Sequence, residues 1–162
     1  MADQRRRRRP ALLAGAAALS MLAGACGSSG PAKSAGTGSS SAVAQIRADW
    51  TTFFKGSTPN ARRVALLQDG SQFAQAIAAQ SKSGLAKTAS ARVTKVTVTS
   101  PTKAKVEYSI SDEGVTALPH QSGVAVKQGG TWKVGDASFC ALLTLEAGGK
   151  TSGLPAACSG AS

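Results

Sequence analysis

The first 41 residues restrict the folded part of this chain to a single small domain. Five consecutive arginines at positions 5–9 precede an apolar run over residues 11–22. Positive charge ahead of a short apolar segment is typical of a secretory signal peptide. The run is too short to cross a bilayer, which takes about 20 apolar residues. We therefore expect residues 1–25 to be removed and the remaining protein to be exported.

Cys26 stands directly after the predicted cleavage site. The sequence Leu22-Ala23-Gly24-Ala25-Cys26 resembles a bacterial lipoprotein signal, in which the cysteine thiol receives a diacylglyceryl group and becomes the mature amino terminus. The small residues before it also form a general cleavage site, so ordinary secretion with an unmodified cysteine is the alternative. The chain has three cysteines, and acylation of Cys26 leaves an even pair, which favours the lipidated form.

Residues 27–41 consist mainly of Gly, Ser, Ala and Thr. Such a composition buries too little apolar surface to fold, so we expect a flexible linker. The predicted organisation is a signal peptide at 1–25, a lipidated cysteine with a disordered linker at 26–41, and one domain at 42–162. Acyl chains would hold the protein on the extracytoplasmic face of the cell membrane. Release into the medium is the alternative localisation.

Net charge narrows the classes of partner. The whole chain carries +11, and removal of residues 1–25, with five arginines and one aspartate, leaves +7. A basic surface can favour anionic lipids or acidic envelope polymers, but charge alone carries no specificity. Nucleic acid is not expected, because the protein is exported and aromatic residues make up only 4% of it. The oligomeric state does not follow from the sequence.

Helical periodicity predicts three helices in the first half of the domain. Apolar residues recur at three- and four-residue spacing over residues 43–54, which indicates an amphipathic helix that Gly56 ends. Thr58-Pro59 marks the start of a short second helix. Apolar residues within 73–77 predict a third. The first of these helices carries most of the aromatic side chains and should form the centre of the core.

The residue pattern in the second half of the domain predicts an antiparallel sheet. Apolar and polar residues alternate over residues 95–110 around a proline turn, which predicts a hairpin with one solvated face. Another strand is expected from Val124, Gly129-Gly130 supplies a tight turn, and residues 132–145 are expected to return as a long strand. Helices followed by about four antiparallel strands give the fold class α+β.

Several motifs together carry a family resemblance. They are Trp50-x-x-Phe53-Phe54, Leu66-Leu67-Gln68-Asp69-Gly70-x-x-Phe73, Gly130-x-Trp132-Lys133-Val134, and Phe139-Cys140-x-Leu142-Leu143 with a distant Cys158. Over residues 42–158 the chain resembles the small exported low-molecular-weight antigens of mycobacteria and their actinobacterial relatives. The resemblance implies a cone similar to the nuclear transport factor 2-like fold, in which a curved sheet wraps one long helix. It implies no established reaction, and relatives include both lipoproteins and secreted proteins.

Cys140 and Cys158 are the remaining cysteines. In an oxidising compartment a structural disulfide is the default for such a pair. Closing a loop of about 15 residues is worth roughly 3 kcal/mol in the chain-entropy model. A redox-active pair is the alternative, but the spacing is long and there is no Cys-x-x-Cys arrangement.

Recognisable catalytic and metal-binding motifs are absent from the sequence. One histidine and dispersed carboxylates do not assemble a zinc site, and Gly149-Lys150-Thr151 lacks the first glycine of a phosphate-binding loop. We therefore expect no cofactor and no metal.

The expected function is a non-catalytic binding or interaction module for an envelope component or a small apolar ligand. The alternative is a small isomerase- or hydrolase-like enzyme, in which Tyr108 acts with His120 or Asp112 in an apolar cavity, with Glu113 as a further candidate side chain. The residues predicted to line the cavity are Trp50, Phe54, Tyr108 and His120.

Overall fold

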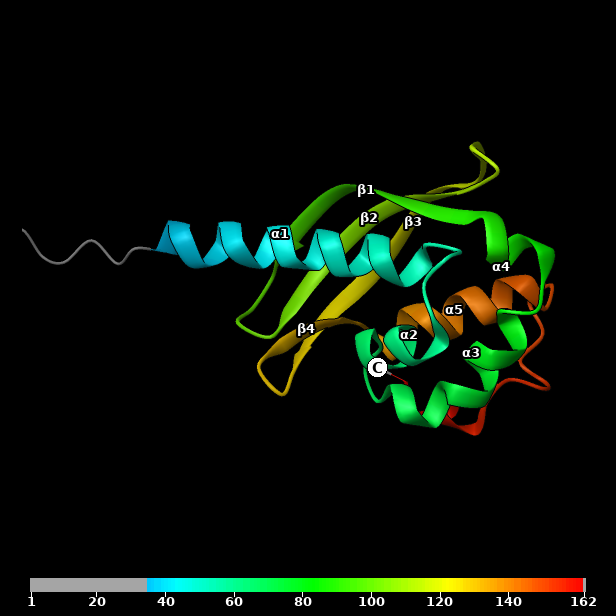
Figure 1. Ribbon diagram of the computed structural model, residues 1–162. Coiled ribbons are helices and arrows are strands. Elements are labelled where there is room, and N and C mark those ends of the chain that lie inside the picture. The colour runs from blue at the N-terminus through cyan, green and yellow to red at the C-terminus, as the bar shows by residue number, and fades with distance from the viewer. Residues whose placement is uncertain (1–34, 162) are drawn as a thin grey trace, which may run out of the picture. The chain divides into compact units, whose positions relative to one another are not determined.

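The computed structural model describes residues 35–161, which form a four-stranded sheet curved around one long helix (Figure 1). The helices are α1 (Ala35–Phe54), α2 (Asn60–Leu66), α3 (Ala74–Gln80), α4 (Gly84–Thr88) and α5 (Asp136–Glu146), with the 3-10 helices η1 (Gly70–Phe73) and η2 (Ala156–Gly160). The strands are β1 (Ala89–Val98), β2 (Lys103–Asp112), β3 (Val115–Gln128) and β4 (Thr131–Val134). Within residues 35–161, none of the helices combines the length and apolar character that a membrane span requires.

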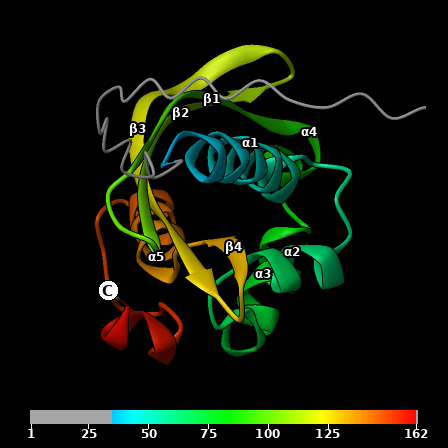
Figure 2. The same ribbon diagram turned by 90° about the vertical axis from the view of Figure 1, so that its left-hand side faces the viewer.

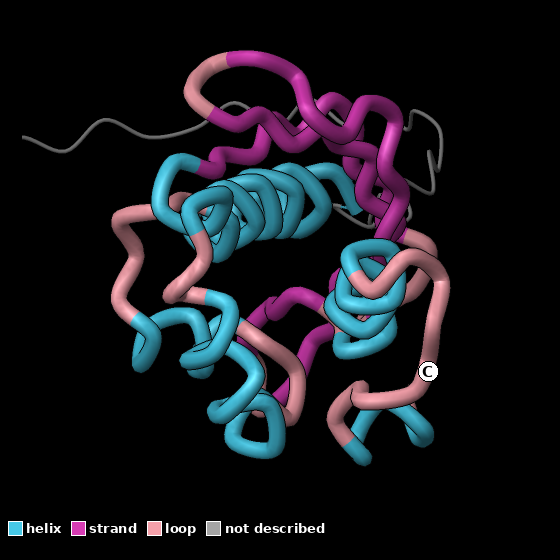
Figure 3. The backbone as a smooth tube through the Cα atoms, turned by 90° about the vertical axis from the view of Figure 1, so that its right-hand side faces the viewer, coloured by secondary structure: helices cyan, strands magenta, loops and turns pink. Residues whose placement is uncertain are grey.

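The sheet is antiparallel throughout, in the order β1-β2-β3-β4. Figure 2 shows the strands curling over α1, which lies in the hollow of the sheet. Helices α2, α3 and α5 lie on the other side of α1, so the core is enclosed between the sheet and this second layer (Figure 3). The predicted α+β class and the cone-like arrangement are confirmed.

Helix α1 packs because its apolar residues follow helical spacing. Ile46, Trp50 and Phe53 are each at most 4% exposed, whereas Arg47 and Ala48 between them face solvent. The helix begins at Ala35, so residues 35–41 are helical although the sequence assigned them to a linker. Extending an existing helix gains one hydrogen bond for each residue ordered, which favours this longer start. The predicted signal peptide, Cys26 and the rest of the predicted linker lie outside the described residues.

Two tight turns connect the central strands. Gly129 and Gly130 adopt φ values of 58° and 81° between β3 and β4, which confirms the predicted glycine turn. A second turn, Glu113-Gly114, has φ values of 48° and 85° and joins β2 to β3. Positive φ at both central residues is the geometry of a two-residue hairpin turn, and glycine tolerates it without steric cost.

Strand β3 begins earlier than expected. The sequence predicted a strand from Val124 and placed Pro119 and His120 in a connection, but β3 starts at Val115 and includes both residues. The pairing of β2 with β3 shifts register on either side of Ile110, and His120 has φ 54°. Such a bulge accommodates a proline within a strand. Strand β4 pairs only with the final residues of β3, so Pro119 has no strand on its second side.

The predicted long return strand over residues 132–145 is wrong. Strand β4 ends at Val134, and α5 follows after Gly135. The carboxylate of Asp136 accepts a hydrogen bond of 2.7 Å from the Ala137 N–H in the first turn of the helix. A short apolar run does not distinguish a strand from a buried helix by periodicity alone, and here α5 buries both Phe139 and Leu143.

Cys140 and Cys158 form a disulfide bond. Cys140 lies on α5 rather than on a strand, and Cys158 lies on η2, with 5.5 Å between their Cα atoms. The bond fastens the C-terminal segment to α5, one of the helices that close the side of the core opposite the sheet.

Candidate functional site

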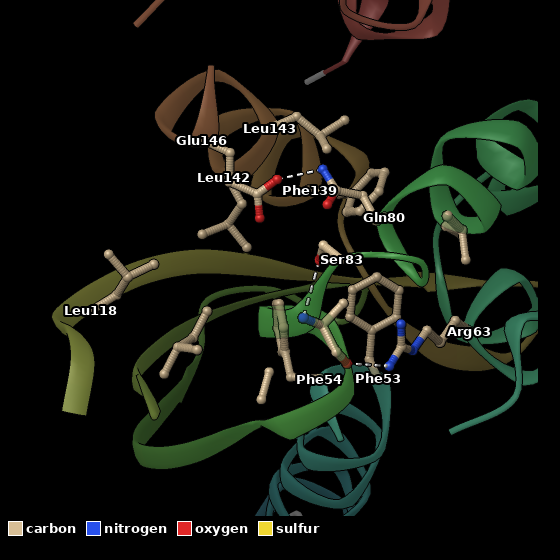
Figure 4. Close-up of a pocket in the computed structure, with 14 residues that line it drawn as sticks. Phe53, Phe54, Arg63, Gln80, Ser83, Leu118, Phe139, Leu142, Leu143 and Glu146 are labelled. Carbon is tan, nitrogen blue, oxygen red and sulfur yellow. Dashed lines mark hydrogen bonds between the residues drawn. The ribbon is translucent and has the colours of Figure 1, made fainter. Parts of the chain in front are cut away.

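An apolar pocket opens where the end of α1 meets α3, α4 and α5 (Figure 4). Its cavity volume is about 100 Å³. The lining comes from helices and strands that are distant in the sequence. The lining residues are Phe53, Phe54, Arg63, Ile77, Gln80, Ser83, Ala86, Ala89, Ile110, Leu118, Phe139, Leu142, Leu143 and Glu146.

Aromatic and aliphatic side chains form most of the wall. Phe53 and Phe54 enter from the last turn of α1, and their rings meet edge to face with centroids 4.9 Å apart. Phe53 also contacts Phe139 of α5 at 5.8 Å. Phe54 and Leu118 are only partly buried, because one side of each faces the opening. A concave apolar wall with a few polar groups is the usual form of a small-molecule binding site.

Polar groups border the opening and link the surrounding helices. Gln80 Nε2 of α3 donates a hydrogen bond to the Glu146 carboxylate of α5, as Figure 4 shows. Ser83 Oγ accepts a hydrogen bond of 3.2 Å from the Ala86 N–H and so caps the start of α4. These groups hold the helices around an opening that is apolar inside.

Arg63 is the buried cation of the pocket. Its side chain starts from α2, and the residue is 7% exposed. Arg63 Nη2 donates to the carbonyl oxygens of Lys55 at 3.0 Å, Gly56 at 3.3 Å and Ala86 at 3.5 Å. Burial lowers the pKa of the guanidinium from its ordinary value. Arg63 thus ties the end of α1 to α4 while its guanidinium remains at the pocket wall.

Phe54 is the member of the predicted cavity-lining set that the structure places in this pocket. Trp50 and Tyr108 are 1% and 2% exposed and pack against each other within the core, with ring centroids 5.3 Å apart. Tyr108 also stacks on Phe54 at 5.5 Å. Trp50 and Tyr108 therefore pack against Phe54 within the core and do not line the pocket. His120 is exposed and belongs to the bulged part of β3.

The residues considered for catalysis do not form a constellation. Burial raises the pKa of Tyr108 to about 12, so its hydroxyl stays protonated at neutral pH. Asp112 accepts a hydrogen bond from Thr88, and Glu113 occupies the β2–β3 turn. In the register of β2 and β3, Tyr108 lies opposite Gln121 rather than His120. Nothing in this geometry favours the enzymatic alternative.

No group of three His, Cys, Asp or Glu side chains within the described part of the chain is arranged to hold a metal ion.

Sequence reasoning missed most of the pocket. Leu142 and Leu143 were assigned to a strand, and the i, i+3, i+4 spacing from Phe139 was the signal that could have placed them on a helix face. Arg63 carried no such signal, because an arginine on a short helix is usually solvated.

Comparison with known protein families assigns the chain to a family. The family model described as low molecular weight antigen MTB12, C-terminal domain, matches residues 39–150. The matched segment contains every pocket-lining residue and Cys140, and it ends before Cys158. Neither the curated proteins nor the solved structures include a match to this chain.

Proposed function

This chain belongs to the low molecular weight antigen MTB12 family, and on that premise we propose that it is an exported cell-envelope protein that binds a small apolar ligand. The family description names an antigen and no reaction, which agrees with a non-catalytic role. In this proposal the N-terminal segment supplies export and a lipid anchor at Cys26, and the cone supplies the binding site.

The observation that carries the binding role is the apolar pocket beside the end of α1. The pocket is open to solvent on one side, and its wall of Phe54, Leu118 and Leu142 leaves apolar surface around a hollow of about 100 Å³ that the chain itself does not fill. Its wall exposes apolar surface that an alkyl or aromatic group can cover. The polar groups of Gln80, Ser83 and Glu146 lie at the rim, where they do not obstruct an apolar guest.

Titration of the mature protein with neutral n-alcohols, from butanol to decanol, tests this role by calorimetry. Each methylene buried in the pocket should tighten binding about fourfold, which corresponds to about 0.8 kcal/mol, until the cavity is full. Ala89→Leu places a larger side chain in the lining and should weaken binding by at least about tenfold.

Ala48→Leu is the matched control, because Ala48 is exposed on α1 and lies outside the pocket lining. This variant should bind the alcohols as the wild type does. If no alcohol of the series binds saturably, or if both variants lose binding equally, the pocket is not a ligand site.

The anchoring part of the proposal is supported by the junction at Cys26, a cysteine directly after a short apolar run and small residues. Cys26→Ala should move the protein from the membrane fraction to the medium and remove the mass of the acyl groups. Ser29→Ala, in the same predicted linker, should leave both unchanged. Wild-type protein found only in the medium, with no added mass on its first residue, would show that the protein is simply secreted.

A further inference from the structure

We propose that the pocket selects apolar carboxylic acids, with Arg63 as the group that binds the carboxylate. This inference rests on the proposed binding function and specifies its ligand class. Three features of Arg63 carry it: a buried charge without an ion-pair partner, unused hydrogen-bond donors, and a position in an otherwise apolar wall.

The charge of Arg63 is not neutralised by a carboxylate in the part of the chain that the structure describes. The ion pair found there joins Lys95 and Glu107 on the sheet, at 3.8 Å. Glu146, the acidic residue of the pocket lining, is hydrogen-bonded to Gln80 instead. Arg63 is 7% exposed as a residue, and a buried guanidinium without a counter-ion has lost hydration with no compensating charge. An anionic ligand group would supply that compensation.

The guanidinium of Arg63 also has hydrogen-bond donors that are not used within the protein. A guanidinium carries five N–H donors, and the three carbonyl contacts of Arg63 all use Nη2. The Nε atom is buried and has no hydrogen-bond partner among the described residues, whereas Nη1, which is also unpaired there, is not fully buried and is the donor that a ligand can reach. Carboxylates accept paired hydrogen bonds from the guanidinium fork, and such charge-assisted bonds are stronger than neutral ones. A carboxylate is therefore the ligand group that best matches what Arg63 leaves open.

The neighbouring wall suits the rest of such a ligand. Phe53 and Phe54 lie beside Arg63 in Figure 4, and Leu118 and Leu142 line the far side of the pocket. An alkyl chain attached to the carboxylate would run along this wall and remain out of water. A free amine, which would place a second positive charge near Arg63, would be rejected.

The test compares three ligands of equal chain length on the wild-type mature protein at neutral pH: octanoic acid, 1-octanol and octylamine. We expect the acid to bind at least about tenfold more tightly than the alcohol, because a hydrogen bond to a charged group contributes more than a neutral one. The amine should bind more weakly than the acid, because its ammonium group cannot accept hydrogen bonds from Arg63. Equal affinities for the acid and the alcohol would overturn the role of Arg63 and leave the binding function intact. Absence of binding by all three would overturn both.

A pair of variants on α2 locates the preference. Arg63→Met should bring the acid and the alcohol to within about twofold of each other while the alcohol still binds. Arg62→Met, which changes the exposed neighbouring arginine, should keep the preference for the acid. A preference that survives in Arg63→Met, or that disappears in Arg62→Met, would contradict the assignment. Arg63 also ties α1 to α4, so if Arg63→Met unfolds, the three-ligand comparison on the wild type decides the question.

Discussion

Two regions of the core beside α1 differ in how completely side chains fill them: a packed end around Trp50 and a pocket end around Phe54. The packed end comprises Trp50, Tyr108, Gly123 and Ser138, where α1 meets β2, β3 and the start of α5. A Cβ atom added to Gly123 would lie 2.8 Å from Trp50 Cζ2 and 2.9 Å from Ser138 Oγ. The pocket end is the open hollow beside Phe54, with a volume of about 100 Å³. One end thus has no space for a methyl group, and the other leaves a hollow unfilled.

The same helix supplies both ends. Trp50 and Phe54 are one helical turn apart on α1, and their ring centroids are separated by 6.1 Å. Tyr108 contacts both rings, and what differs is the rest of the surroundings of each ring. A glycine at position 123 lets β3 approach the indole closely, whereas Phe54 faces a region where α4 and β1 present Ala86 and Ala89. The comparison indicates that the packed end contributes more to stability than the pocket end, to which the proposed function assigns ligand binding.

The largest effect on stability is expected from Trp50→Ala, which tests the difference between the two ends. Removing a fully buried aromatic side chain should lower the free energy of unfolding by about 3–5 kcal/mol. Leu118→Ala at the pocket end should cost only about 1 kcal/mol, since Leu118 already faces a cavity. Urea unfolding of both variants measures the difference. Equal losses would mean that the two ends contribute alike to stability.

Opening the disulfide tests how the pocket end is held together. Cys158→Ala should lower the free energy of unfolding by about 3 kcal/mol, because the bond closes a loop between residues 18 positions apart. Reduction of the wild type should have the same effect, and reduction of the variant should have none. Octanol affinity should fall as well, since the bond fastens the C-terminal segment to the helix that carries Leu142. Unchanged octanol affinity in the reduced protein would show that α5 keeps its position without the bond.

The free energy of unfolding at alkaline pH tests whether Tyr108 is buried in the packed end. The folded pKa is about 12, and the unfolded chain releases this proton at about pH 10. Between about pH 10 and 12 the folded state holds the proton that the unfolded state has lost. The free energy of unfolding should therefore fall by about 2–3 kcal/mol as pH rises through this range. Tyr108→Phe should lack this component, so parallel pH curves for the wild type and the variant would contradict the burial of Tyr108.

Among the changes at the packed end, the smallest effect is expected from Gly123→Ala. The added methyl group has to displace Trp50 or Ser138, and overpacking of this kind costs about 1–3 kcal/mol. Gly160→Ala is the matched control, because a Cβ atom there meets no neighbour within 4 Å. Thermal unfolding of both variants is the measurement. A neutral Gly123→Ala would show that the packed end has room to adjust.

Much of the fold could be predicted because its signals are local. The spacing of Ile46, Trp50 and Phe53 repeats within one helix, and the alternation along β1 and β2 repeats within each strand. Gly129-Gly130 specifies a turn through its own backbone freedom. The cysteine pair was predictable by counting, since the predicted acylation of Cys26 would leave two thiols.

The site could be predicted only in part. Phe54 was placed in a cavity from its position on the aromatic face of α1. Trp50 and Tyr108 lie on the same aromatic surface, but the packing opposite them fills the space completely. His120 was considered because it is the single histidine, and the bulge in β3 leaves it exposed. Chemical type alone does not tell which side chains face a hollow.

By itself the sequence determined that helical periodicity is followed by strand alternation, and it determined the tight glycine turn and the pairing of two cysteines. Each of these depends on residues that are close in the chain or few in number. The tertiary structure alone decided that residues 136–146 form a helix, because a short apolar run is stable in whichever form its neighbours can bury. It also decided the pocket. A cavity is a space that distant elements leave unfilled, and Arg63 becomes a pocket residue only when α2, α4 and the end of α1 enclose its guanidinium.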